Sequence, residues 1–119
     1  MRPHRKLDVW KEAVEFVVAI YQATRSFPKT EQYALADQLR RAAVSIPSNI
    51  AEGAARQTKK EFIQFLFIAK GSAAEVQSQL YTALDLKYVA RESFDSIYTQ
   101  MDVVSKQISR FITYLKSAD

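Results

Sequence analysis

The sequence contains no cysteine, a single histidine, two glycines and three prolines among its 119 residues. Without cysteine the chain can form no disulfide, no thiolate metal site and no thiol nucleophile. Strand-rich domains need frequent turn residues, so the scarcity of glycine and proline favours a few long helices. No apolar run is long enough to span a bilayer or to form the core of a signal peptide. We therefore expect a cytoplasmic protein that makes no membrane contact.

The composition that remains is that of one globular domain. Hydrophobic residues make up 48% of the chain and charged residues 25%, which is typical of a folded protein and argues against disorder. We interpret residues 1–119 as a single domain in which residues 1–7 form a flexible basic arm. The formal net charge of +4 permits contact with phosphates but is far below that of a dedicated nucleic-acid tail.

Apolar residues recur at helical spacing in four segments. We expect the first helix to begin after an Asp8 N-cap and to end at Phe27, because the residue before a proline avoids the helical region. Thr30 is the expected cap of a second helix that continues to about Arg56, with Glu31 in its first turn.

The third and fourth helices follow after a turn at residues 57–58. Thr58 and Glu61 form a Thr-x-x-Glu capping box, so the third helix should start there and continue to about Tyr88. Ser93 is the expected cap of the fourth helix. Four helices with short connections predict an all-α, up-down-up-down antiparallel four-helix bundle.

The second helix carries one apolar and one polar stripe, with Pro47 in its middle. We expect a kink at Pro47 instead of a break, because the apolar stripe keeps its phase from Ile46 to Ile50. A polar line on the third helix should face this polar stripe. We therefore expect Arg41 of the second helix to form a partly buried ion pair with Glu75 of the third. The predicted polar network between these helices comprises Gln38, Arg41, Ser45, Asn49, Glu52, Ser72 and Glu75.

The third helix is apolar around most of its circumference near its start. One bundle core accepts only one apolar stripe, so the surplus should be buried against another subunit. The expected oligomer interface comprises Phe65, Phe67 and Ile68. The alternative interpretation is that this helix lies unusually deep within its own bundle.

Catalysis has little support in the sequence. The only histidine, His4, lies in the arm, and the Glu-x-x-His pairs of a di-iron bundle are absent. A Ser-His-Asp triad would have to be built on that mobile histidine. We expect no enzyme activity, no catalytic residue, no metal ion and no cofactor.

Basic residues are the best candidates for a binding site. Arg56, Lys59 and Lys60 cluster at the turn before the third helix, where free backbone amides also favour phosphate. Arg40 is expected to face outward, and Arg5 and Lys6 would add contacts from the arm. The alternative is that all these charges belong to a solvated surface that maintains solubility.

Several short motifs resemble a known family. They are Phe27-Pro28 with Glu31 and Leu35, Gln38-Leu39-Arg40-Arg41-Ala42, Ser45-Ile46 with Asn49-Ile50-Ala51-Glu52-Gly53, and Gly71-Ser72-Ala73 with Glu75. Together, from Leu7 to about Leu115, they resemble the four-helix-bundle family linked to 23S rRNA intervening sequences. Pro47 departs from the pattern and affects local helix geometry.

The resemblance implies a pentameric ring of antiparallel bundles. It also implies kinship with the accessory protein of diversity-generating retroelements, a barrel that associates with a reverse transcriptase and with nucleic acid. The family members encoded within rRNA intervening sequences have no settled activity. We therefore expect a non-enzymatic accessory or scaffold protein whose partners are copies of itself, RNA or DNA, and a protein such as a reverse transcriptase. The alternative is a protein-binding adaptor ring with no nucleic-acid role.

Overall fold

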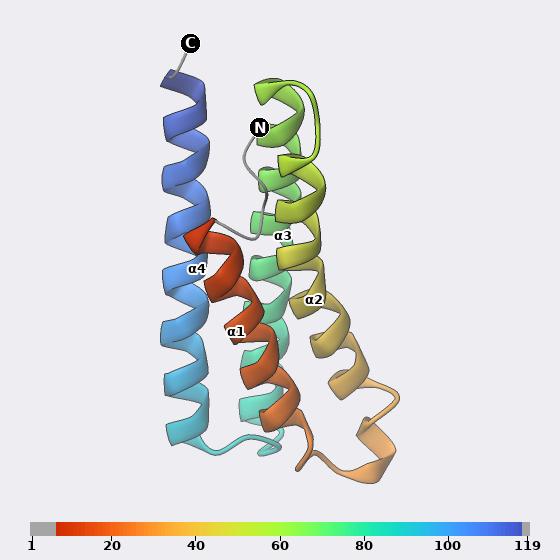
Figure 1. Cartoon of the computed structure of the whole chain (residues 1–119). Coiled ribbons are helices and arrows are strands. Elements are labelled where there is room, and N and C mark those ends of the chain that lie inside the picture. The colour runs from red at the N-terminus through yellow and green to blue at the C-terminus, as the bar shows by residue number, and fades with distance from the viewer. Residues whose placement is uncertain (1–6, 118–119) are drawn as a thin grey trace.

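The computed structural model describes residues 7–117 as four long helices and one short helix. The elements are α1 (Asp8–Thr24), the 3-10 helix η2 (Lys29–Glu31), α2 (Leu35–Ala54), α3 (Lys59–Asp85) and α4 (Arg91–Ser117). Successive long helices run antiparallel, and each contacts its neighbours around the bundle, with α1 closing against both α2 and α4 (Figure 1). The predicted up-down-up-down four-helix bundle is confirmed.

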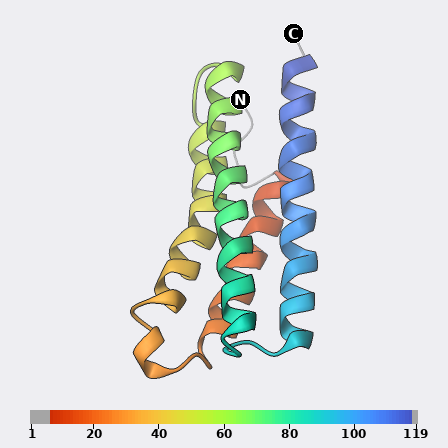
Figure 2. The same cartoon turned by 180° about the vertical axis from the view of Figure 1, so that it is seen from behind.

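The bundle is elongated, measuring 48 × 23 × 20 Å. The α1–α2 and α3–α4 connections lie at one end, and the α2–α3 turn lies at the other, near the end of α4 (Figures 1 and 2). The two connections at the first end touch, since the rings of Phe27 and Tyr88 are 5.6 Å apart. We call this the connection end and the opposite one the turn end.

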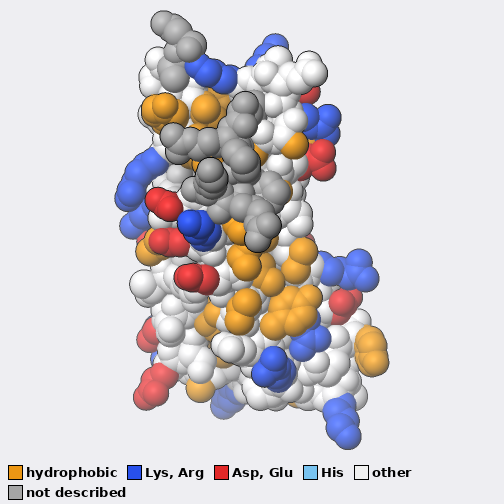
Figure 3. Space-filling view, in the orientation of Figure 1, with side chains coloured by type: hydrophobic (Ala, Val, Ile, Leu, Met, Phe, Trp, Pro, Cys, Tyr) orange, Lys and Arg blue, Asp and Glu red, His pale blue; other side chains and the backbone are white. Residues whose placement is uncertain are grey.

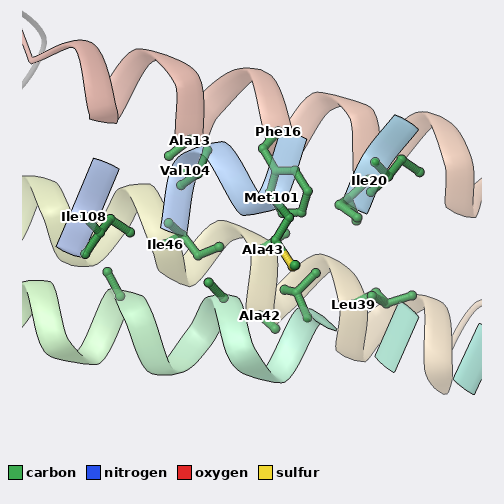
Figure 4. Packing of buried hydrophobic residues seen from close by; sticks show 14 of the residues in the cluster. Ala13, Phe16, Ile20, Leu39, Ala42, Ala43, Ile46, Met101, Val104 and Ile108 are labelled. Atoms are coloured by element: carbon green, nitrogen blue, oxygen red, sulfur yellow. The ribbon is translucent and has the colours of Figure 1, made fainter. Parts of the chain in front are cut away.

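The core is made by the apolar stripe of each helix. The side chains of Phe16, Ile46 and Ile108 are fully buried where α1, α2 and α4 meet (Figure 4). Seven of the residues at the predicted stripe positions are inaccessible to solvent, namely Phe16, Leu39, Ile46, Ile50, Leu66, Val76 and Ile108. Trp10 of α1 is only half-buried and packs against the edge of the core.

The α2–α3 hairpin is closely packed because Gly53 lies where the two helices meet. A Cβ atom at Gly53 would stand 2.8 Å from Phe62 Cδ1 and 2.8 Å from Phe65 Cβ, well inside ordinary contact distance. Neither glycine of the chain has a positive φ, so the backbone conformation does not require glycine here. Gly53 is needed for the close approach of α3.

Local signals predicted one helix start and missed three. Thr58 caps α3 as predicted, because its hydroxyl accepts a hydrogen bond from the Glu61 amide at 3.1 Å. Asp8 is the first helical residue, and Leu7 stands at the N-cap position without a side-chain bond. Thr30 lies inside η2, and α2 begins only at Leu35, whose amide donates to Glu31 Oε1 at 3.4 Å.

The fourth helix also starts earlier than expected. It begins at Arg91, so Ser93 lies in its first turn and is not its cap. α3 ends at Asp85, three residues before the expected end, because Lys87 adopts a left-handed backbone with φ 64°. The amides of Lys87 and Tyr88 donate to the carbonyls of Leu84 and Ala83, both at 2.9 Å. These two bonds form a Schellman cap in which lysine occupies the position that usually holds glycine.

Pro47 lies inside α2, which continues through it as one helix. The expected kink stays a prediction. The side-chain amide of Asn49 donates to the Ser45 carbonyl at 2.7 Å and to Ser45 Oγ at 2.9 Å. These bonds strengthen the turn around Pro47, where the proline has no amide of its own to donate.

Candidate nucleic-acid interface

Arg56 is held at the turn end by three groups around it. Its amide donates to the Gly53 carbonyl at 3.1 Å, which tightens the exit from α2. Its guanidinium donates to Glu52 Oε2 at 2.8 Å and stacks over the Phe65 ring, 4.8 Å from the ring centroid. The Nε atom is covered and has no hydrogen-bond partner. Arg56 is therefore a fixed cation, partly neutralised by Glu52.

Lys59 and Lys60 lie in the first turn of α3 and are exposed to solvent. Neither forms an ion pair within residues 7–117. The nearby Glu61 accepts a hydrogen bond from the Thr58 hydroxyl at 2.9 Å, so its carboxylate is turned toward the cap. The first amides of a helix have no intrahelical acceptor, and they add positive potential beside these two lysines.

Lys116 joins this end of the molecule and was missed by the sequence analysis. Phe62 contacts Phe111 edge-on at 5.1 Å, so the end of α4 lies level with the start of α3. Lys116 Nζ stands 5.2 Å from the centroid of the Phe67 ring. The antiparallel pairing of the last two helices was the signal that could have placed it. We call Arg56, Lys59, Lys60 and Lys116 the turn-end cluster.

The other predicted nucleic-acid contacts are not at this end. Arg40 was expected to face outward, but its Nε donates to Thr24 Oγ1 at 2.9 Å and its Nη2 to Gln32 Oε1 at 2.8 Å. Its guanidinium also lies over the Tyr21 ring at 5.5 Å. Arg40 therefore ties α2 to α1 and is not available as an outward phosphate ligand. Arg5 and Lys6 lie outside the described residues.

The predicted polar network reduces to three side chains. Ser45 Oγ and Ser72 Oγ share a hydrogen bond of 2.8 Å across α2 and α3, and Asn49 completes the group through its bonds to Ser45. The remaining members lie on the surface or make bonds within their own helix: Gln38, Arg41, Glu52 and Glu75.

The predicted pair of Arg41 with Glu75 is wrong. Arg41 Nε bonds Asp37 Oδ2 at 2.9 Å, and 80% of the Arg41 side chain is exposed. Glu75 Oε2 instead accepts a hydrogen bond from Gln79 Nε2 at 3.4 Å. A carboxylate four residues away on the same helix is always within reach, and it captures the arginine without the cost of burying either charge.

The apolar side chains expected at an oligomer interface differ in exposure. Phe67 is 46% exposed and Ile68 is 51% exposed, whereas Phe65 is half-buried beneath Arg56. Gly71, one turn further along α3, has nothing within 4 Å of the position its Cβ would occupy. The outer face of α3 thus combines two large apolar side chains with an open glycine, while self-association itself stays a prediction.

Tyr81 on α3 and Tyr98 on α4 are in contact, with their ring centroids 5.8 Å apart. The neighbouring Tyr98 hydroxyl raises the pKa of Tyr81, and burial adds to the effect. Tyr98 also accepts a hydrogen bond from Gln77 Nε2 at 2.8 Å.

Within residues 7–117 no group of three His, Cys, Asp or Glu side chains could hold a metal ion, and no helix there is long and apolar enough to cross a membrane.

The geometry defines an all-α four-helix bundle with a cluster of cations at one end. Residues 5–110 match the family described as 23S rRNA-intervening sequence protein, so the chain belongs to this family. A crystal structure from Bacteroides thetaiotaomicron, described as a protein of unknown function from the S23 ribosomal protein family, is similar. It superposes with a TM-score of 0.79 at 27% sequence identity, covering 87% of this chain and 97% of that one. No curated protein matches the chain.

Proposed function

We propose that this protein is a non-enzymatic, self-associating accessory protein that binds nucleic acid through the turn-end cluster. The observation that carries the proposal is the gathering of four cations from three segments of the chain at one end of the bundle. Lys59, Lys60 and Lys116 have no carboxylate partner within the described residues, so their charges remain available to phosphates. The association of the family with 23S rRNA intervening sequences supports an RNA ligand.

Self-association would multiply this cluster. The outer face of α3 exposes Phe67 and Ile68, which a second copy would bury, and Gly71 would let another helix approach. The resemblance described above implies five copies. In a closed ring each copy presents the same cations, so contacts that are individually weak combine through avidity.

The nucleic-acid proposal is tested by titrating labelled RNA and DNA at two salt concentrations. The triple variant R56Q/K59Q/K60Q should weaken binding and lower the slope of log K against log salt by about 2 for single strands. The control variant K11Q/R91Q/K106Q removes the same number of positive charges elsewhere. It should change the affinity and the salt slope much less. If R56Q/K59Q/K60Q binds with the affinity and the salt slope of the wild type, the proposed interface is refuted.

Self-association is tested separately by light scattering. The F67E/I68E variant places two charges on the outer face of α3 and should have the mass of one chain, whereas the wild type should have the mass of an oligomer. A wild type that remains monomeric at high concentration would contradict the ring. An oligomer that binds no nucleic acid at physiological salt would instead support the second candidate, an adaptor whose apolar α3 faces dock a protein.

A further inference from the structure

The connection end of the bundle presents exposed aromatic rings among cations. Tyr33, which lies between η2 and α2, is 93% exposed, and Tyr21 near the end of α1 is 42% exposed. Arg25 and Lys29 are exposed in the same stretch of chain. Figure 3 shows hydrophobic side chains over the lower part of α1 and the adjoining α2, with Lys and Arg side chains around them.

The backbone just before Tyr33 is fixed by side-chain hydrogen bonds. Gln32 Nε2 donates to the carbonyls of Thr24 at 2.9 Å and Phe27 at 3.0 Å, so residue 32 is fastened to the end of α1. Arg40, one turn into α2, donates to Gln32 Oε1 and to Thr24 Oγ1. The connection is thus tied to both helices, and Tyr33 projects from a support that is already ordered.

Local backbone structure places each tyrosine beside one cation. Tyr21 and Arg25 are four residues apart on continuous helical backbone, so they are neighbours on one face. The Gln32 amide donates to the Lys29 carbonyl at 3.2 Å, which keeps Lys29 within one turn of Tyr33. We call Tyr21, Arg25, Lys29 and Tyr33 the tyrosine platform.

The charge of this surface is positive. Between residues 21 and 41, Lys and Arg outnumber Asp and Glu four to two. Asp37 is paired with Arg41, and Glu31 accepts a hydrogen bond from the Leu35 amide. Arg25 and Lys29 form no ion pair within the described part of the chain, and the hydrogen bonds of Arg40 go only to neutral groups.

We propose that the tyrosine platform binds single-stranded nucleic acid, with an unpaired base stacked on Tyr33 and phosphates held by Arg25 and Lys29. The Tyr21 ring already carries the Arg40 guanidinium over it, so it contributes a further base contact through its exposed part. Exposed aromatic rings beside cations are the combination that single strands require, because every unstacked base offers a π face and the backbone offers charge. A duplex keeps its bases stacked inside, so it could use only the cations. The proposal rests on the proposed function and names the form of nucleic acid that this protein prefers.

An acidic peptide is the other ligand that such charges could attract. Peptide anchors are buried in pockets, and an aromatic anchor on the receiving surface lines the pocket wall. Tyr33 instead stands on top of the surface, with 93% of its area open to solvent. That placement suits a base laid flat against the ring better than a side chain inserted beneath it.

The test compares a labelled single-stranded uridine oligomer with a labelled RNA duplex, using fluorescence anisotropy on the full chain. Y33A should lower the affinity for the single strand about 5- to 150-fold, which is the loss of one stacked base at roughly 1–3 kcal/mol. Its duplex affinity and its salt slope should match the wild type. Y33F, which keeps the ring, is the matched control and should bind as the wild type does. R25Q/K29Q should lower the salt slope for both ligands.

The outcomes separate this inference from the proposed function. Single-strand affinity unchanged in Y33A would overturn the platform while leaving the turn-end cluster intact, because R56Q/K59Q/K60Q reports on that cluster independently. Absence of binding to either RNA by the wild type would overturn both proposals. If a poly-glutamate peptide binds more tightly than the uridine oligomer, and Y33A weakens that binding, the ligand of the platform is an acidic protein segment and not a nucleic acid. Thermal melts of each variant confirm folding, which the exposure of Tyr33 leads us to expect.

Discussion

Replacing Gly53 with alanine tests how closely α2 and α3 approach each other. The new Cβ would stand 2.8 Å from Phe65 Cβ, which is attached directly to the α3 backbone and cannot rotate away. It would stand equally close to Phe62 Cδ1, where a ring rotation offers some relief. Overpacking of this kind costs about 1–3 kcal/mol, and the better helix propensity of alanine returns up to about 1 kcal/mol. We expect a net loss of about 1–2 kcal/mol.

The second glycine provides the matched comparison. Gly71 is also in a helix interior, but nothing lies within 4 Å of its Cβ position, so G71A should stabilise the isolated chain by about 0.5–1 kcal/mol. Urea unfolding followed by circular dichroism should separate the two variants by roughly 2 kcal/mol, and their melting temperatures should differ by about 8 °C or more. Equal stability of G53A and G71A would show that α3 does not approach α2 as closely as described.

Three further predictions concern single contacts. K87G should raise the free energy of unfolding by about 1 kcal/mol in urea melts, because the left-handed backbone at Lys87 strains any residue with a Cβ; an unchanged midpoint would contradict the Schellman cap. S45A should cost about 1 kcal/mol by leaving buried Ser72 without its partner, and a double-mutant cycle with S72A should show that the two losses are not additive. Y98F should lower the pKa of Tyr81 in an ultraviolet titration of tyrosinate, with Y81F identifying the signal. Folding raises the pKa of Tyr81, so the stability that this group contributes is complete below the ordinary tyrosine value of about 10. That stability is lost as pH rises through the raised pKa. If Y98F leaves the titration midpoint of Tyr81 unchanged, Tyr98 is not the cause of the shift.

The sequence predicted the features that depend on local or periodic signals. The four helices follow from apolar periodicity, and the Thr58 cap follows from a hydroxyl and a carboxylate three residues apart. The caps expected at Asp8, Thr30 and Ser93 were wrong because a suitable side chain caps a helix only where its own backbone is extended. That condition depends on how the chain enters the helix, which the residue type does not reveal.

The candidate site was harder to predict because its parts come from distant segments. Arg56, Lys59 and Lys60 are close in sequence, so their clustering was visible, whereas Lys116 required the pairing of α3 with α4. Arg40 was placed outward because helical phase alone does not show which flank of α2 the preceding helix covers. The Arg41–Glu75 pair failed because Asp37, one turn away on the same helix, binds Arg41 first.

The most direct test of the proposed nucleic-acid interface follows the backbone amides of Lys59 and Lys60 by NMR during titration with single-stranded RNA at physiological salt. Both amides lie in the first turn of α3, where no intrahelical acceptor is available. We predict that their resonances shift and that their hydrogen exchange slows as phosphate oxygens accept from them. Binding that leaves both amides unchanged would contradict the account.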